Sequence, residues 1–276
     1  MIKSLKKYYD KNQISPFNFD CQYFDSCIQV AKDRSKFTKG NAPYIGLEYE
    51  KGDLPRLLFL SLDTGNSESD PNKRTIEYSR KWCLDWLPEN RKVIRQHWYR
   101  THQFAWHIFN EINKKYNLDL VIGNVDRNFE FQPDEEIHKI KPYFTSLVSI
   151  KCCVNKEHRK QAPNILYKNC RNYILGELKI LNPDILVSQG NEARAVVEKM
   201  EISKVIKQEN ISKANPRKND FKIMKLPSGK VLLWIHHYHP ASMRGKGTTF
   251  DLNYTKYKLY AKKTSQFLFD YHLYGN

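Results

Sequence analysis

Residues 56–62 place the strongest constraint on the fold of this chain, because they form a nearly uninterrupted apolar run. A strand of that kind is buried on both faces, which is typical of a parallel sheet covered by helices. Three later apolar segments predict three more strands, at residues 147–151, 184–188 and 231–236. Strands of this type need helices to cover them.

Helix-like stretches separate the predicted strands. Apolar side chains recur with helical spacing at about residues 100–116, 164–181, 192–201 and 254–271, and Pro183 stands just beyond the second stretch. This alternation predicts an α/β protein with three layers, α/β/α, around a central, mainly parallel four-stranded sheet.

The length of 276 residues is normal for one α/β domain, so residues 1–276 are expected to form a single domain. Polar segments near residues 66–95 and 203–220 interrupt the pattern and are predicted to be loops or insertions. No segment resembles a transmembrane span or a signal peptide, and residues 1–20 are polar and lysine-rich. We expect a cytoplasmic protein without a membrane partner, acting as a monomer.

The charge of the chain is strongly positive. Lysine and arginine number 46 against 30 acidic residues, which gives a formal net charge of +16. An excess of this size indicates a polyanionic partner such as DNA, and a lysine-favouring genome composition is the alternative explanation. Five cations add to it around the later cysteines, namely Lys151, Arg159, Lys160, Lys168 and Arg171.

The six cysteines are expected to be reduced in a cytosolic protein, which makes them metal ligands or buried apolar residues. Cys21 and Cys27 form an N-terminal pair. Cys152, Cys153 and Cys170 form a later group, and Cys83 is isolated. Cys83 stands near Trp82 and Trp86 in a helix-like stretch, so a place in the core explains it most simply.

Two candidate catalytic residues follow predicted strands. Asp63 comes directly after the first strand, and His239 closely follows the fourth, at the start of the run His-Pro-Ala-Ser-Met-Arg. Since the carboxyl ends of parallel strands meet at one edge of a sheet, both are expected at the same edge. An Asp before Gly65 can also simply cap a turn, and His236 and His237 are alternative histidines.

Three further segments complete a recognisable order: Lys-Cys at residues 151–152, Cys-Arg-Asn-Tyr at 170–173, and Leu-Lys-Ile-Leu-Asn-Pro-Asp-Ile-Leu-Val-Ser-Gln-Gly at 178–190. With the two candidate catalytic motifs, they resemble the uracil-DNA glycosylase superfamily, most closely its iron–sulfur, family-four branch. The resemblance covers roughly residues 21–271, with insertions. It implies a monofunctional DNA glycosylase, which flips a base out of DNA and hydrolyses its N-glycosidic bond to leave an abasic site.

The resemblance also implies a 4Fe-4S cluster, with an N-terminal segment of about residues 1–50 attached to it. The family holds its cluster with an N-terminal cysteine pair and a downstream pair, which correspond here to Cys21, Cys27, Cys152 and Cys170. The N-terminal spacing is wider than in the family, and Cys153 competes with Cys152. Zinc is an alternative occupant, and buried cysteines without metal are another.

Family roles transfer to the residues of these motifs. The resemblance implies that Asp63 activates water and stabilises positive charge on the sugar, while His239 donates a hydrogen bond to the departing base. The implied contacts to substrate and DNA are Thr64 and Gly65 of the first motif, and Ser242, Met243 and Arg244 of the loop that enters the duplex. Separately, the turn at Gly190 and Asn191 leads into a predicted helix whose N-terminal amides could hold a DNA phosphate, and a plain strand–turn–helix connection is the alternative.

Two departures from the family point away from uracil as the substrate. Alignment on Lys151 and Cys152 puts Val148 where the family has an Asn that hydrogen-bonds to uracil, and Trp98 lies where a stacking Phe is usual. The expected substrate is therefore a modified pyrimidine, such as a hypermodified cytosine of phage DNA, in antiviral defence. The alternatives are a uracil-DNA glycosylase of base-excision repair, an inactive DNA-binding module, and a metal-dependent nuclease using Asp63 with the neighbouring histidines.

Overall fold

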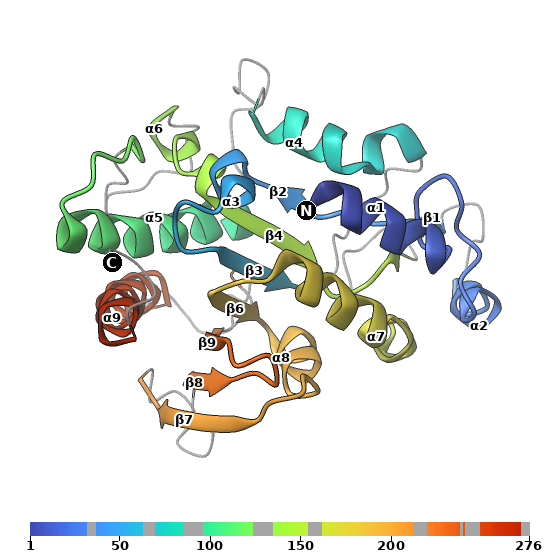
Figure 1. Ribbon diagram of the computed structural model, residues 1–276. Coiled ribbons are helices and arrows are strands. Elements are labelled where there is room, and N and C mark those ends of the chain that lie inside the picture. The colour runs from blue at the N-terminus through green and yellow to red at the C-terminus, as the bar shows by residue number, and fades with distance from the viewer. Residues whose placement is uncertain are drawn as a thin grey trace.

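The computed structural model describes residues 1–31, 37–62, 70–84, 96–123, 135–153, 162–211, 220–237, 240 and 249–271, with backbone alone at 82–84, 96–97, 135, 137 and 249–255. Its main element is a seven-stranded sheet (Figure 1). The strands are β2 (Tyr44–Ile45), β3 (Leu57–Ser61), β4 (Phe144–Val148), β6 (Ile185–Gln189), β7 (Lys204–Glu209), β8 (Phe221–Lys225) and β9 (Val231–His237). Two short strands, β1 (Thr38–Lys39) and β5 (Cys152–Cys153), pair with each other outside this sheet.

The strand order is β2-β4-β3-β6-β9-β8-β7. The central strands β4, β3, β6 and β9 are parallel to one another, whereas β2, β8 and β7 run antiparallel to their neighbours. The mixed α/β class is confirmed. The prediction of a four-stranded sheet is wrong, because antiparallel strands extend the parallel centre at both edges.

Helices pack on both faces of this sheet (Figure 1). The core on one face joins α5 (Gln96–Tyr116) and α9 (Thr249–Asp270), and the core on the other joins α1 (Ile2–Lys11), α7 (Asn164–Leu181) and α8 (Asn191–Val197). The shorter helical segments are α2 (Phe24–Ile28), α3 (Leu47–Lys51), α4 (Ile76–Leu84), α6 (Glu135–His138), η2 (Pro71–Arg74) and η3 (Lys141–Tyr143). Within the described ranges, no helix combines the length and apolarity needed to cross a membrane.

The two cores explain why the central strands are apolar without alternation. Successive side chains of a strand point to opposite faces. In β3, Leu58 and Leu60 belong to the core beneath α7 and α8, whereas Leu57 and Phe59 belong to the core beneath α5 and α9. Both sets therefore have to be apolar.

β4 ends three residues earlier than the predicted strand at 147–151. The backbone N–H of Ser149 donates to the carbonyl oxygens of Ser61 at 2.9 Å and Leu62 at 3.0 Å, just beyond the end of β3. The chain then leaves the main sheet, and the following residues enter β5. The apolar character of Ile150 comes from its burial in the core rather than from a place in the sheet.

The predicted loops contain regular structure. Residues 203–220 include β7, whose side chains are almost all exposed, so the strand lacks the apolar alternation that would reveal it. Residues 66–95 include η2 and α4. In η2, the Asp70 side chain caps the turn by accepting from the Asn72 backbone N–H at 2.9 Å.

Candidate active-site edge and cysteine cluster

The four parallel strands end side by side, and their last residues form one row across the sheet. Val148 of β4 lies beside Ser61 of β3. Ser61 is hydrogen-bonded to Gln189 of β6, and Gln189 lies beside His237 of β9. The row faces α5, since Gln189 contacts Thr101 of that helix.

Hydrogen bonds fix the centre of this row. Ser61 Oγ donates to Gln189 Oε1 at 2.7 Å, and Gln189 Nε2 donates to Thr101 Oγ1 at 3.0 Å. Gln189 and Thr101 are both buried. A buried amide costs free energy unless it is hydrogen-bonded, so these contacts hold the amide in one orientation and tie β3, β6 and α5 together.

The chain changes its direction of progress across the sheet between β3 and β6. From β3 it continues to β4 on one side, and from β6 it continues to the strands on the other side. In open α/β sheets, ligands bind outside the carboxyl ends of the strands at such a switch point. Ser61 and Gln189 end the two strands that flank it, so this edge is the favoured position for a ligand.

The predicted catalytic residues belong to segments that leave the sheet at this edge. Asp63 follows the end of β3 by two residues, and His239 follows the end of β9 by two residues. Both lie outside the described residues, as do Thr64, Gly65, Ser242, Met243 and Arg244. Pro240 is described, and Arg100 of α5 donates its Nη1 to the Pro240 carbonyl oxygen. Consecutive residues of α5 therefore contact β6 and the segment after β9.

Trp98, the predicted base-stacking residue, lies in the first turn of α5, one turn before Thr101. It is partly buried, and its ring is edge-on to His102 with centroids 5.8 Å apart. The structure therefore places Trp98 on the helix that contacts the row of strand ends.

The turn after β6 requires a glycine. Gly190 has a φ of +104°, and a Cβ atom there would stand 3.0 Å from the Leu62 side chain. The Gly190 N–H donates to the His237 carbonyl oxygen at 2.8 Å. Because this amide already has a partner within the protein, a phosphate bound at this turn would need other donors. Asn191 is exposed at the start of α8, which has seven residues.

His236 and His237 are adjacent in β9 and point to opposite faces of the sheet. His237 packs against the rings of Phe104 and Tyr257, on the side of α5 and α9. His236 Nδ1 lies 3.1 Å from Ser188 Oγ, and burial lowers the pKa of His236 to about 4. This divergence argues against a metal site that uses both histidines.

The four cysteines predicted as ligands come together at the N-terminal side of α7. The thiol of Cys152 is hydrogen-bonded to those of both Cys27 and Cys170, and Cys21 interacts electrostatically with Cys170 and Cys27. All four are buried in one core. Cys153, the rival of Cys152, is not part of that core, as expected for the next residue of a strand.

The environment makes two of these thiols more acidic than usual. The hydrogen bond with Cys152 lowers the pKa of Cys27 to about 6, and the hydrogen bond with Cys152 also lowers the pKa of Cys170. Backbone and amide N–H groups assist, since Lys151 N donates to Cys170 Sγ at 3.2 Å and Asn169 Nδ2 donates to Cys27 Sγ at 3.3 Å. Burial raises the pKa of Cys21, and the hydrogen bonds with Cys170 and Cys27 raise that of Cys152.

Four thiolates are the donor set that zinc or an iron–sulfur cluster takes. In the part of the chain that the structure describes, no three or more His, Cys, Asp or Glu side chains are arranged as an ion would need them. The four described thiols interact with one another, but their arrangement does not meet the geometry of a metal site. Four cysteines are nevertheless the residue types that bind zinc or a 4Fe-4S cluster.

The structure corrects one prediction about the cations near the cysteines. Lys151 is 1% exposed and therefore cannot contact DNA. Lys168 is exposed on α7 and Arg171 is partly buried, whereas Arg159 and Lys160 lie outside the described residues.

The polar residues at the ends of β3 and β6 and on α5 were not predicted from the sequence. The available signal was the pair Ser188 and Gln189, two polar residues at the end of an apolar run. No protein-family model and no curated protein matches this chain. The chemistry of the residues is therefore the basis for assigning a function.

Proposed function

We propose that this protein is a monofunctional DNA glycosylase of the uracil-DNA glycosylase superfamily. The observation that carries the proposal is the arrangement of the strand ends. β3 and β9, the strands that precede Asp63 and His239, flank β6 at the switch point of the sheet. One residue of chain lies between each of these strands and its candidate catalytic residue, so both can act on one ligand bound at this edge.

The proposed reaction is hydrolysis of an N-glycosidic bond. Water adds to C1′ of the deoxyribose, the C1′–N bond breaks, and the base leaves with the electron pair and gains a proton. The Asp63 carboxylate would orient the water and stabilise positive charge on the sugar. His239 would donate a hydrogen bond to the base oxygen on which negative charge develops.

The row of strand ends supports a substrate other than uracil. Val148 stands beside Ser61 at the end of β4, where its side chain offers no hydrogen bond. The amide that does lie in the row, Gln189, is already held by Ser61 and Thr101. The described ends of these strands therefore offer no free side-chain amide to hydrogen-bond to uracil. A modified pyrimidine suits such a site better, and a bulky modified cytosine of phage DNA is the specific candidate.

The test is an excision assay on oligonucleotides that carry uracil, 5-hydroxymethylcytosine or its glucosylated form. We expect an abasic product from a modified cytosine, with strand breakage only after alkali, and weak activity on uracil. Val148→Asn should raise the activity on uracil. Uracil excision by the unaltered protein that exceeds excision of every modified cytosine would contradict the substrate assignment. DNA binding without excision of any base would favour the inactive module.

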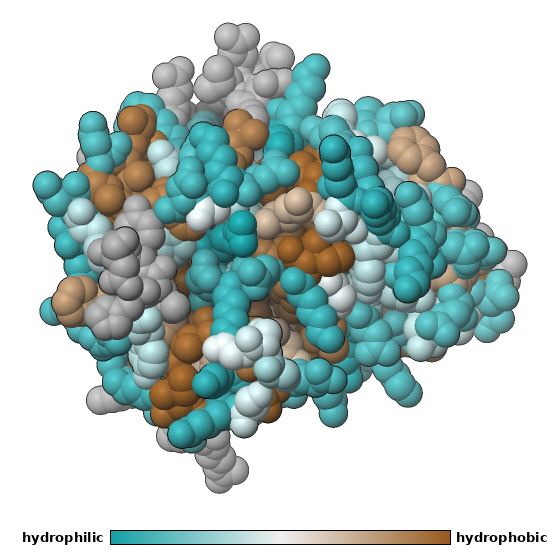
Figure 2. Space-filling view, viewed as in Figure 1, coloured by the Kyte–Doolittle hydropathy of each residue, from teal (hydrophilic) through white to brown (hydrophobic). Residues whose placement is uncertain are grey.

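DNA affinity should depend steeply on salt, because a protein with a net charge of +16 binds DNA largely by neutralising phosphates. Hydrophilic side chains cover much of the face seen in Figure 2. Between 50 and 200 mM salt, affinity should fall on the order of a thousandfold if about six phosphates are contacted. Arg244→Ala should weaken binding to different DNA sequences by similar factors, measured by fluorescence anisotropy. Affinity that does not change with salt would mean that the charge reflects composition alone.

We also propose that Cys21, Cys27, Cys152 and Cys170 hold a 4Fe-4S cluster, with zinc as the alternative. The support is the convergence of these four thiols from three separate parts of the chain. A cluster bound by them would fasten the N-terminal segment to α7 and the residues around β5.

A further inference from the structure

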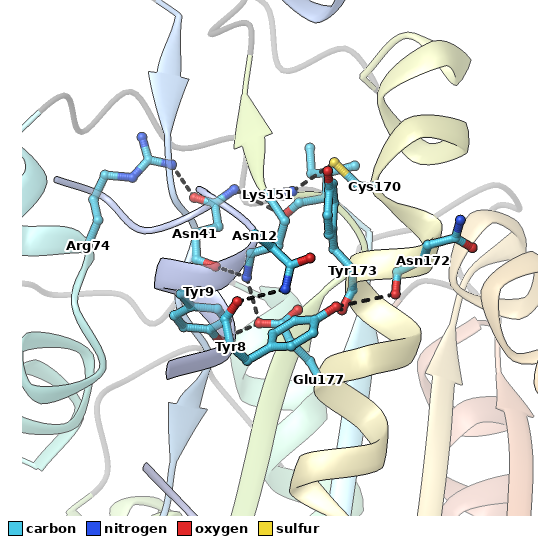
Figure 3. A network of polar contacts seen from close by, with 11 residues as sticks. Tyr8, Tyr9, Asn12, Asn41, Arg74, Lys151, Cys170, Asn172, Tyr173 and Glu177 are labelled. Atoms are coloured by element: carbon cyan, nitrogen blue, oxygen red, sulfur yellow. Dashed lines mark hydrogen bonds and ion pairs between the residues drawn. The ribbon is translucent and has the colours of Figure 1, made fainter. Parts of the chain in front are cut away.

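The Lys151 side chain is buried, at 1% exposure, and Figure 3 shows it among its polar contacts near Cys170. Lys151 Nζ donates to the Glu177 carboxylate at 2.6 Å and to the Asn41 carbonyl oxygen. Glu177 is 0% exposed, and it also accepts a hydrogen bond from the Tyr9 hydroxyl of α1. The Tyr9 ring lies 4.8 Å from the ammonium group. The three partners of the ammonium thus come from α1, α7 and the loop between β1 and β2.

The backbone of Lys151 is held as firmly as its side chain. The Asn41 N–H donates to the Lys151 carbonyl oxygen at 2.9 Å. Arg74 of η2 in turn donates to the Asn41 side chain. A residue fixed by its ammonium group and by its carbonyl has little freedom to move.

These contacts bear directly on two of the four thiols. Lys151 immediately precedes Cys152, and its N–H donates to Cys170 Sγ at 3.2 Å. Glu177 lies on α7, two turns after Cys170 and on the same side of that helix. Lys151 is therefore attached to α7 at two points, one at the thiol and one at the carboxylate.

We propose that Lys151 and Glu177 are positioning residues of the four-thiol site. Their ion pair fixes the residues before Cys152 against the helix that carries Cys170, and so sets the separation of those two thiols. The inference rests on the proposed metal centre but not on glycosylase activity. Groups that orient metal ligands from the second layer typically contribute 10- to 100-fold to metal affinity.

A purely structural role for this ion pair is the competing explanation, and physical chemistry separates the two. Burying two charges costs free energy that their attraction only partly repays, so apolar replacements of both residues are often neutral for stability. A pair kept for stability alone is replaceable. A pair that positions thiols is not, because apolar side chains cannot hold Cys152 and Cys170 at a fixed separation.

The test measures Co²⁺ affinity of the full-length, reduced protein by chelator competition, following the thiolate-to-Co²⁺ charge-transfer band. We expect Lys151→Met and Glu177→Gln each to weaken Co²⁺ binding about 10- to 100-fold. The double variant Lys151→Met/Glu177→Leu should recover thermal stability but not Co²⁺ affinity, and it covers the case in which a single variant fails to fold. As a control, Lys168→Met removes an exposed lysine of α7 and should leave thermal stability and Co²⁺ affinity unchanged.

The outcomes distinguish this inference from the proposed function. Wild-type Co²⁺ affinity in the folded double variant would overturn the positioning role while leaving the metal centre intact. Failure of the unaltered protein to bind Co²⁺, zinc or an iron–sulfur cluster would overturn the metal centre and this inference with it. Normal metal binding without base excision would contradict the glycosylase proposal alone.

Discussion

Replacing His239 with alanine should lower the single-turnover rate of base excision by on the order of 100-fold or more, while DNA binding survives. The reason is that the imidazole would act on the leaving base only as charge develops, so its loss removes transition-state stabilisation rather than affinity. Asp63→Asn should have an effect of similar size, because an amide cannot stabilise the positive charge on the sugar. Rates are measured with enzyme in excess over an oligonucleotide that carries the preferred base.

The matched control is His236→Gln, in β9, the strand that precedes His239. The His236 side chain lies by Ser188, on the face of the sheet opposite His237, and should not reach the ligand edge. The excision rate of the His236→Gln variant, per folded molecule, should therefore stay close to that of the unaltered protein. Full activity in both His239→Ala and Asp63→Asn would remove these residues from the mechanism. Strand breakage that needs added divalent metal and no alkali would favour the nuclease.

The parallel centre of the sheet was predictable because burial on both faces leaves an unmistakable pattern. In β3, alternate residues enter two different cores, so nearly every position is apolar. The edge strand β7 has the opposite property. Its side chains are almost all exposed and include Lys204, Lys207 and Gln208, and a strand defined by pairing on one side alone leaves no apolar signature.

The candidate site was predictable only where chemistry is tied to sequence order. The convergence of the four thiols could be expected from a family pattern, whereas the burial of Lys151 could not. A lysine side chain is normally solvated. Its partners, Tyr9, Asn41 and Glu177, are distant in sequence, so only the tertiary structure brings them to the ammonium group. The contact of Gln189 with Ser61 and Thr101 is hidden for the same reason.

Cys170→Ser should abolish metal binding and destabilise the fold. Protein purified without oxygen should be brown, with about four irons per chain if four thiolates hold a 4Fe-4S cluster. Cys170 is buried between Cys152 and the Lys151 N–H, and a serine hydroxyl is a poor ligand for iron in such a site. Iron and sulfide analysis gives the metal content, and thermal unfolding gives the stability.

Cys153→Ser and Cys83→Ser are the matched controls for this prediction. Cys153 is adjacent to a proposed ligand yet lies outside the core that contains the four thiols, so its loss should leave the iron content unchanged. Cys83, whose side chain lies outside the described residues, should behave in the same way. A colourless protein with one zinc per chain would replace the cluster with a zinc site and keep the ligands. Loss of metal in Cys153→Ser but not in Cys152→Ser would show that the neighbouring cysteine is the ligand, which would require β5 to turn its other face toward α7.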